Sequence, residues 1–353
     1  MKILLITHSL DYKSGWGRYS HDLLEALRSN NNEVNVLNIL PNPLLFKRLI
    51  FLTPWYIIRS IFYWNRIKDV DCIHCLIEPY AFFTLVLSQI FNKKYFITVH
   101  GSYAVKTLAN NFLEPFQKLA YKKAKKIISI SHFTERKLME FTKLSNVVVI
   151  PNGGPSEVSL GSFSKTEDSL ISVGALKWRK GHHKTIEAVA LIKKEIPNIN
   201  LTIVGNQSDK KYVDSLNNRI LELGLMENIK ILSNLSELEL NEVYNKSKIF
   251  ILLPLSGKLD FEGFGLVYLE ANTHALPVIG ALNSGAEEAI NDGQSGFLVD
   301  PEDSKTTALY LKKLLVDDGL YVSMSNGALI WAASMTWKKQ VIKYIELYKK
   351  NDN

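Results

Sequence analysis

The second half of this chain contains a glycine-rich turn from strand to helix, Asp260-Phe261-Glu262-Gly263-Phe264-Gly265-Leu266-Val267-Tyr268-Leu269-Glu270. It follows the apolar run from Ile249 to Leu253, which is typical of a buried strand, and it enters a helical pattern near Gly265. A glycine-flanked turn from strand to helix leaves backbone N–H groups free at the helix start, and such groups bind phosphate or sugar oxygens. Glu262 and Glu270 stand about two helical turns apart, so we expect both carboxylates to face one ligand.

Similar patterns of strand and helix alternate along the whole chain, which predicts an α/β fold with mainly parallel sheets. The expected strands of the first half are Lys2–Thr7, Glu33–Ile39, Val70–Leu76, Tyr95–Val99, Lys126–Ile130 and Val147–Ile150. Those of the second half are Leu170–Val173, Asn200–Val204, Ile229–Leu232, Ile249–Leu253, Pro277–Ile279 and Gly296–Val299. Six strands in each half predict two doubly wound, Rossmann-like units in tandem.

The boundary between the two units is expected in Pro151–Asp168, which is rich in Gly, Ser and Pro and lacks apolar periodicity. We therefore assign residues 1–160 to a first domain and residues 166–336 to a second. Ligands of such folds dock at the carboxyl ends of parallel strands and at domain interfaces. The chemistry is expected on the loops that follow the strands, in a central cleft that the two domains face.

The composition of the 353 residues is that of a globular protein, with 46% hydrophobic and 22% charged residues. This length excludes a peptide hormone or a lone zinc finger. The net charge of +7 favours phosphates, anionic sugars or an anionic membrane surface as partners. Only two cysteines are present, so a disulfide scaffold and a four-cysteine zinc site are excluded. Cys72 and Cys75 lie in an apolar strand and are expected to be buried structural thiols, with a redox or metal role as the alternative.

No apolar run reaches the ~20 residues that a membrane-spanning helix needs. The N-terminal run Lys2–Thr7 lacks a small-residue cleavage site, so we expect it to be a first strand and not a signal peptide. We therefore expect the protein to be cytoplasmic. Residues 42–66 carry four cations and no acidic residue, and aromatic side chains are interleaved with them. This segment is either a helical pair packed on the sheet, with its cations in water, or a peripheral attachment to the inner face of the membrane.

Two turns carry candidate anion-binding residues. After the first strand, Gly15 and Gly17 precede a helical pattern and let N–H groups approach an anion. A dinucleotide fingerprint is disfavoured there because its third glycine would fall at Ser20. After the strand that ends at Val173, the three cations Lys177, Arg179 and Lys180 form either a phosphate clamp or a solvated surface.

The histidines are ambiguous on sequence grounds. His100 follows the strand Tyr95–Val99 and is either a catalytic or a structural residue at the carboxyl edge of the sheet. The same two alternatives, structural or catalytic, apply to three other histidines, His8, His74 and His132. Two more, His182 and His183, are expected at the surface. The spacing of these residues matches no zinc motif.

Together these motifs resemble the retaining nucleotide-sugar glycosyltransferases of family 4, which have the GT-B fold. The resemblance covers nearly the whole chain. It rests on the family's Glu-x7-Glu motif at Glu262 and Glu270, and on Arg179-Lys180-Gly181, Val204-Gly205, Pro277-Val278, Gly285-Ala286-Glu287, Gly15 to Tyr19, Val99-His100-Gly101 and Pro151-Asn152-Gly153.

The resemblance implies a role for each site residue. The implied catalytic residues are Glu262 and His100 at the transferred sugar, with Arg179 and Lys180 on the diphosphate. Glu270 would bind the nucleotide ribose, and the other implied donor-binding residues are Gly15, Gly17, Gly205, Leu235, Gly263, Phe264, Gly265 and Leu266. The first domain would bind the acceptor and the second the nucleotide sugar, and the last helix, residues 337–353, would cross back to the first domain. Ala175 stands where the family often has Arg, so Arg179 must supply that charge.

We therefore expect a hexosyltransferase that moves a sugar from a nucleoside diphosphate sugar to a hydroxyl acceptor with retention of anomeric configuration. The acceptor would be a glycan, a polysaccharide precursor or a lipid-linked molecule. No carboxylate pair suited to Mg²⁺ stands at a strand end, so we expect no metal and no cofactor. Nucleic acid is not an expected partner. The alternatives are another sugar-nucleotide enzyme, such as an epimerase or a phosphorylase, and a non-catalytic nucleotide-sugar-binding protein.

Overall fold

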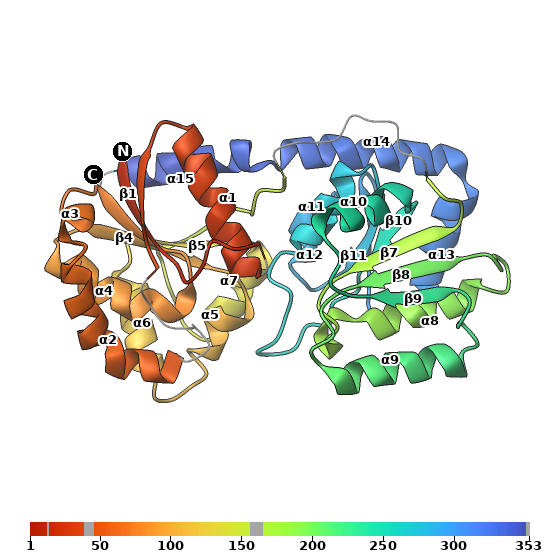
Figure 1. Cartoon of the computed structure of the whole chain (residues 1–353), viewed down its shortest axis with the longest axis horizontal. Coiled ribbons are helices and arrows are strands. Elements are labelled where there is room, and N and C mark those ends of the chain that lie inside the picture. Colours follow the sequence, from red (N-terminus) through yellow and green to blue (C-terminus); the bar gives the residue numbers. More distant parts are fainter. Residues whose placement is uncertain (13, 39–45, 156–164, 351–353) are drawn as a thin grey trace. The chain divides into compact units, whose positions relative to one another are not determined.

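The structure is a computed structural model that describes residues 1–12, 14–38, 46–155 and 165–350. The end of the expected second strand, the start of segment 42–66, the middle of the expected linker and the last residues of the expected C-terminal helix lie outside these ranges. The chain divides into two compact units (Figure 1). The first unit is Met1–Gly153 with Trp337–Asn353, and the second is Gly154–Thr336.

The first unit contains a parallel sheet in the order β2-β1-β3-β4-β5-β6. The bounds of its strands are β1 Lys2–Ile6, β2 Glu33–Leu37, β3 Cys72–Cys75, β4 Lys94–Val99, β5 Lys126–Ser129 and β6 Val147–Val149. They confirm the six predicted strands of the first half, with small differences at the ends. Four successive residues of β1, Ile3 to Ile6, are buried, because helices cover both faces of a doubly wound sheet.

The helices of the first unit follow the strands in alternation. Their bounds are α1 Gly15–Ser29, α2 Phe46–Ile61, α3 Trp64–Ile67, the 3₁₀ turn η2 Glu78–Tyr80, α4 Ala81–Ile90, α5 Ser102–Lys106, α6 Glu114–Lys123, α7 His132–Met139 and α15 Trp337–Lys349. Helix α1 begins after Ser14, whose hydroxyl accepts a hydrogen bond from the Gly17 N–H at 3.0 Å. This side-chain cap satisfies one of the free donors of the first turn.

The C-terminal helix α15 belongs to the core of the first unit, where its Trp337, Val341 and Tyr344 are buried. A buried polar chain ties it to the sheet. The Tyr348 hydroxyl lies 2.6 Å from His74 Nδ1, and His74 Nε2 lies 2.8 Å from the Thr98 hydroxyl. Burial lowers the pKa of His74 to about 3, so its ring is neutral. Of the two roles that the sequence left open for His74, these contacts support the structural one.

The second unit contains a parallel sheet in the order β12-β11-β10-β7-β8-β9. Its strands are β7 Ser169–Val173, β8 Asn200–Val204, β9 Ile229–Leu232, β10 Ile249–Ile251, β11 Val278–Ala281 and β12 Gly296–Val299. Its helices are the 3₁₀ turn η3 Trp178–Lys180, α8 His182–Ile192, α9 Lys210–Glu222, α10 Glu237–Lys246, α11 Leu266–Thr273, α12 Ala286–Ala289, α13 Ser304–Val316 and α14 Asp318–Ser334. The six predicted strands of the second half are confirmed.

Both sheets reverse their strand order once. In the first unit the chain moves from β1 outward to β2 and then returns to β3 on the other side of β1. In the second it moves from β7 to β9 and returns to β10 on the other side of β7. Such a reversal places the carboxyl ends of two neighbouring strands beside a natural ligand site. The predicted α/β fold with two Rossmann-like units is confirmed.

The two cysteines are free and fully buried in β3. Burial raises the pKa of both thiols to about 12, which suppresses the reactive thiolate form. The prediction of buried structural thiols is confirmed. In the part of the chain that the structure describes, no helix is long and apolar enough to cross a membrane.

Candidate active site

The second unit brings three predicted site residues together at its strand reversal. Arg179 and Lys180 lie in η3, which follows β7, and Glu262 lies in the loop that follows the neighbouring strand β10. Lys180 Nζ lies 2.5 Å from Glu262 Oε2, and Arg179 Nη1 lies 3.2 Å from the same oxygen. The third cation of the predicted clamp, Lys177, is exposed. The structure therefore forms a triad of one carboxylate between two cations.

The charge state of Glu262 follows from these contacts. Its side chain is only 13% exposed, and burial alone would raise its pKa. Lys180 and Arg179 outweigh this effect and hold the pKa below its ordinary value. The carboxylate is therefore ionised at neutral pH, and it partly neutralises the basic turn.

The glycine-rich loop holds Glu262 by main-chain contacts with the loop after β11. The Gly285 N–H donates to the Glu262 carbonyl at 2.9 Å. A Cβ atom at Gly285 would lie 2.2 Å from the Gly263 carbonyl carbon, so only glycine permits this approach. Gly263, Phe264 and Gly265 are buried, and α11 begins at Leu266 as predicted.

Glu270 lies in α11, eight positions after Glu262, and is 8% exposed. Gly205 follows β8, and its N–H donates to the Leu232 carbonyl at 3.1 Å. Leu235 is half-buried and stands before Ser236, the capped start of α10. All the predicted donor-binding residues of the second half thus lie at the carboxyl edge of one sheet, where parallel strands place their loops.

The remaining predicted residues lie in the first unit. Gly15 is exposed at the start of α1, whereas Gly17 is buried and its N–H is already engaged by Ser14. His100 is half-buried after β4, and its Nε2 lies 2.7 Å from the Leu76 carbonyl. Because a carbonyl only accepts, Nε2 carries the ring proton and Nδ1 remains an acceptor. Burial lowers the pKa of His100 to about 4, so the ring is neutral at pH 7.

One residue at this edge, Glu78, was not predicted from the sequence. Its carboxylate is fully buried, and its Oε1 accepts the His100 N–H at 2.5 Å. The Gln117 amide donates to the Glu78 carbonyl at 3.0 Å, which anchors η2. The available signal was an acidic residue three positions after a buried strand, followed by Pro79.

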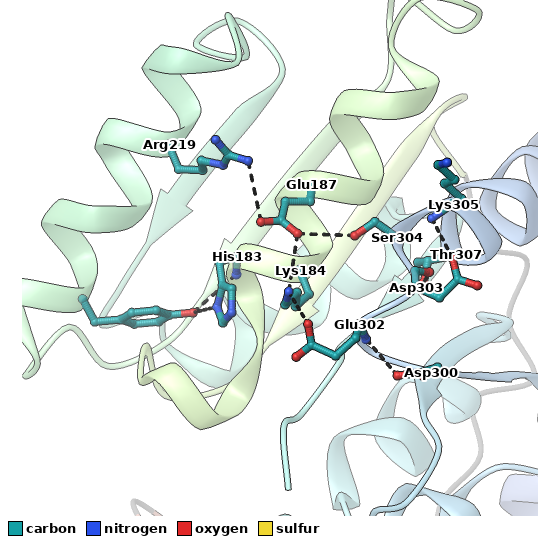
Figure 2. Close-up of polar contacts among 11 residues, drawn as sticks. His183, Lys184, Glu187, Arg219, Asp300, Glu302, Asp303, Ser304, Lys305 and Thr307 are labelled. Atoms are coloured by element: carbon teal, nitrogen blue, oxygen red, sulfur yellow. Dashed lines mark hydrogen bonds and ion pairs between the residues drawn. The ribbon is translucent and has the colours of Figure 1, made fainter. Parts of the chain in front are cut away.

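The prediction that His182 and His183 lie at the surface is wrong, because α8 begins against the edge of the sheet. His182 is fully buried, and its Nδ1 lies 3.1 Å from the Ser172 hydroxyl. His183 Nδ1 lies 2.8 Å from the Tyr212 hydroxyl (Figure 2), and its ring stacks on Trp178 at 4.0 Å between centroids. His182 is covered by Ser172 of β7, and His183 is covered by Tyr212 of α9 and by Trp178 of the preceding turn η3.

An ion-pair group on the second unit joins α8, α9 and the start of α13 (Figure 2). Lys184 Nζ lies 2.6 Å from Glu302, and Glu187 lies 3.7 Å from both Lys184 and Arg219. The shallow hollow beside it, about 460 Å³, is lined by Leu191, Asp300, Glu302, Asp303, Ser304 and Lys305. None of the predicted site residues lines it. Among the described residues, no three His, Cys, Asp or Glu side chains gather closely enough to hold a metal ion.

Solved structures with the same architecture align along nearly the whole chain. The Anabaena protein HepE in complex with UDP-glucose has a TM-score of 0.74 and 18% identity, over 98% of this chain and 99% of that one. Sucrose-phosphate synthase from Thermosynechococcus elongatus has a TM-score of 0.77 and 18% identity, over 99% and 98% of the two chains. A glycosyltransferase from Rickettsia africae has a TM-score of 0.73 and 20% identity, over 99% of each. These similarities define the fold as GT-B.

Two family models match the two halves of the chain. Residues 13–155 match Glycosyltransferase Family 4, and residues 161–331 match Glycosyl transferases group 1. The fold and these matches define the class of the protein, a glycosyltransferase with the GT-B fold. Within this class the chain belongs to the family 4 glycosyltransferases, as its motifs predicted.

Curated relatives match about half of the residues of the chain. D-inositol 3-phosphate glycosyltransferase from Corynebacterium urealyticum is 30% identical over 50% of this chain and 42% of its own length. A GDP-mannose-dependent alpha-(1-6)-phosphatidylinositol monomannoside mannosyltransferase from Mycolicibacterium smegmatis is 27% identical over 50% of this chain and 47% of its own length. The chain thus spans about half the length of the curated relatives it matches.

Proposed function

We propose that the protein transfers a hexosyl unit from a nucleoside diphosphate sugar to a hydroxyl acceptor, with retention of anomeric configuration and without a metal ion. The observation that carries this proposal is the triad of Arg179, Lys180 and Glu262 at the strand reversal of the second unit. Two cations held beside the start of α11 form a site for a diphosphate, and the family to which the chain belongs gives this site its chemistry.

The triad explains how the site changes when a donor binds. A diphosphate carries more negative charge than one carboxylate and competes with Glu262 for Arg179 and Lys180. A displaced Glu262 carboxylate is then able to accept hydrogen bonds from the sugar hydroxyls. In the transition state charge develops on the departing phosphate, and each preorganised donor contributes about 3 kcal/mol to its stabilisation.

Retention follows if the acceptor attacks from the face that the phosphate leaves. The bond from the anomeric carbon to the phosphate oxygen breaks, and the bond to the acceptor oxygen forms on the same face. The acceptor proton passes to the departing phosphate oxygen. This scheme needs no enzyme nucleophile at the ~5 Å separation that retaining hydrolases use. By the same proposal, His100 Nδ1 accepts a hydrogen bond from a substrate hydroxyl.

The names of the relatives indicate which substrates to test first. The Anabaena structure holds UDP-glucose, and the mycolicibacterial relative uses GDP-mannose. The relatives act on an inositol phosphate or a phosphatidylinositol mannoside, so polyol phosphates and lipid-linked glycans are the first acceptors for this chain. A polysaccharide precursor belongs to the same chemical class.

The donor site is tested by calorimetry and transfer assays with UDP- and GDP-sugars. We expect Glu270→Ala to weaken donor binding roughly tenfold or more, because a carboxylate that accepts ribose hydroxyls is lost. Arg179→Ala with Lys180→Ala should lower kcat roughly 100-fold or more. Glu222→Ala, an exposed acid on α9, is the matched control. Wild-type affinity in Glu270→Ala would contradict the ribose role, and tight nucleotide binding without turnover would favour a binding protein.

We also propose that the first unit attaches peripherally to the inner, cytoplasmic face of a membrane through α2 and α3. The described part of α2 exposes large apolar side chains. Its exposed positions include Phe51, Trp55 and Ile58 at helical spacing, and the exposed Phe62 follows directly after the helix. Residues 42–66 carry four cations and no acid, which matches an anionic lipid surface. Vesicle flotation tests this proposal.

A further inference from the structure

The carboxyl edge of the first sheet carries a buried acid that the proposed mechanism does not use. Glu78 is fully buried in η2, the turn that follows β3, at the strand reversal of the first unit. Its Oε2 atom is buried and has no hydrogen-bond partner among the described residues. A buried carboxyl oxygen in this position costs free energy, so the residue requires a function or a compensating contact.

The compensating contact is the main chain of His100. Glu78 Oε1 accepts the His100 N–H at 2.5 Å, and the imidazole Nε2–H donates back to the Leu76 carbonyl at 2.7 Å. The loops after β3 and β4 therefore hold each other by two reciprocal hydrogen bonds. One bond fixes the main chain of His100, and the other fixes its ring.

The turn after His100 makes this support necessary. Gly101 has a φ of 136° and a ψ of −125°, a conformation that only glycine adopts readily. The chain thus turns sharply between β4 and α5, and β4 itself ends at Val99 before His100. His100 therefore follows the last strand residue and precedes this turn. The Tyr19 ring, at 4.4 Å and 79° to the imidazole, supports its edge.

We propose that Glu78 is the positioning residue of His100, holding its main chain so that Nδ1 faces the substrate as an acceptor. This inference rests on the proposed function, which places a substrate hydroxyl at His100 Nδ1. An ionised Glu78 makes a charge-assisted hydrogen bond to the His100 N–H, and a protonated Glu78 makes a weaker neutral one. The hydrogen bond that holds the main chain of His100 is therefore stronger when Glu78 is ionised.

The groups around Glu78 keep their charge state near neutral pH, so Glu78 is the group there that titrates. Burial raises its pKa to about 7, against the opposing effect of the His100 N–H. Cys75 of β3 and Tyr121 of α6 interact with it, and burial raises the pKa of Cys75 to about 12 and that of Tyr121 well above its usual value. Burial likewise raises the pKa of Tyr19 of α1, and it lowers that of His100 to about 4. The Trp16 indole, which is also close to the carboxyl group, does not titrate.

The test compares Glu78→Gln with the wild type over pH 5 to 9. Gln keeps the shape and the acceptor oxygen but cannot ionise. In the wild type we expect the His100 backbone amide proton, followed by NMR and assigned with His100→Gln, to shift with a midpoint near pH 7. In Glu78→Gln this titration should disappear while the ring keeps its Nε2–H tautomer. Glu114→Gln, at a half-buried acid on α6 that pairs with Lys118, is the matched control and should titrate like the wild type.

Kinetics provide the second readout. We expect kcat of the wild type to rise through pH 7 as Glu78 ionises, and we expect that limb to be absent in Glu78→Gln. Glu78→Ala, which lacks the acceptor, should lower kcat roughly tenfold or more, with the KM of the donor changed less than about threefold. An unchanged amide titration or an unchanged kcat profile in Glu78→Gln would overturn the proposal. If no transfer is detected in any variant but the amide titration behaves as expected, the proposed function fails and the link between Glu78 and His100 stands.

Discussion

Two buried carboxylates, one in each unit, differ in charge because their surroundings differ. Glu262 lies against Lys180 and Arg179, and the two cations keep its pKa low despite burial. Glu78 has only neutral donors near it, so burial raises its pKa to about 7. The same residue type is therefore a fixed negative charge in the second unit and a titrating group in the first.

The high pKa of Glu78 predicts a pH-dependent loss of stability. Below about pH 4.5 the carboxyl group is protonated in both the folded and the unfolded chain. As the pH rises, the unfolded chain ionises first, so the free energy of unfolding falls until the pH passes about 7. As the pH rises from 5 to 8, the free energy of unfolding of Glu78→Gln should increase by about 2 to 3 kcal/mol relative to that of the wild type.

Urea unfolding, followed by tryptophan fluorescence at several pH values, measures this difference. Buried neutral histidines such as His74 and His182 change stability in the opposite direction, because they resist protonation at low pH. They are present in both proteins, so the difference between wild type and variant isolates Glu78. A difference that does not change with pH would show that Glu78 ionises at its ordinary pKa.

At the scale of the element, the position of α11 depends on the loop between β11 and α12. The Gly285 N–H holds the Glu262 carbonyl, and the Gly263 main chain occupies the space of a missing Cβ atom. The glycine-rich turn and the start of α11 are thus one packed unit with the next loop. A local pattern alone would not show this dependence.

Gly285→Ala should displace the turn that carries Glu262. The added methyl group would lie 2.2 Å from the Gly263 carbonyl and 2.4 Å from the Phe264 nitrogen, so the main chain must move. We expect a loss of roughly 2 kcal/mol of stability and weaker donor binding, measured by thermal unfolding and calorimetry. Gly319→Ala in α14, where the nearest atom is 3.4 Å away, is the control and should be neutral or slightly stabilising. Equal effects of both substitutions would contradict the packing argument.

At the scale of the whole molecule, the first unit is completed by contacts between segments far apart in sequence. Tyr344 and Tyr348 of α15 reach Tyr19 and His74, more than 250 residues earlier. Because α15 follows the second unit in the sequence, the first unit cannot form its full core until the whole chain has been synthesised. The polar chain through Thr98 fixes how α15 lies, because each hydroxyl must find its partner in a buried site.

The proposed membrane attachment belongs to the same scale. We expect the wild type to float with vesicles containing an anionic phospholipid at low salt, and much less with zwitterionic vesicles. Trp55→Ser with Phe62→Ser should reduce the bound fraction roughly tenfold or more, because two exposed aromatic anchors are lost. Leu238→Ser with Ile330→Ser removes exposed apolar side chains from the second unit and is the matched control. Absence of flotation at low salt, or an equal loss in the control, would refute the attachment.

Local sequence patterns were enough to predict the twelve strands, the α/β class, the start of α11 and the family. These features depend on patterns within about ten neighbouring residues, where apolar runs, glycine turns and helical spacing act locally. The residue types at the carboxyl ends of β7 and β10 were also readable, because parallel strands always bring such ends to one edge. Glu262, Arg179 and Lys180 were predicted from this rule before their contacts were known.

Which polar residues are buried, and which partners they contact, depends on how the helices and strands pack in three dimensions. His182 and His183 stand between Gly181 and Lys184 in a sequence that indicates a surface, yet Ser172, Tyr212 and Trp178 cover them. In the sequence, Glu78 looks like an ordinary acidic residue of a loop. Its hydrogen bond with His100 depends on the pairing of β3 with β4. Tyr212 lies 29 residues after His183, and Glu78 lies 22 residues before His100, so these contacts cannot be read from a local pattern.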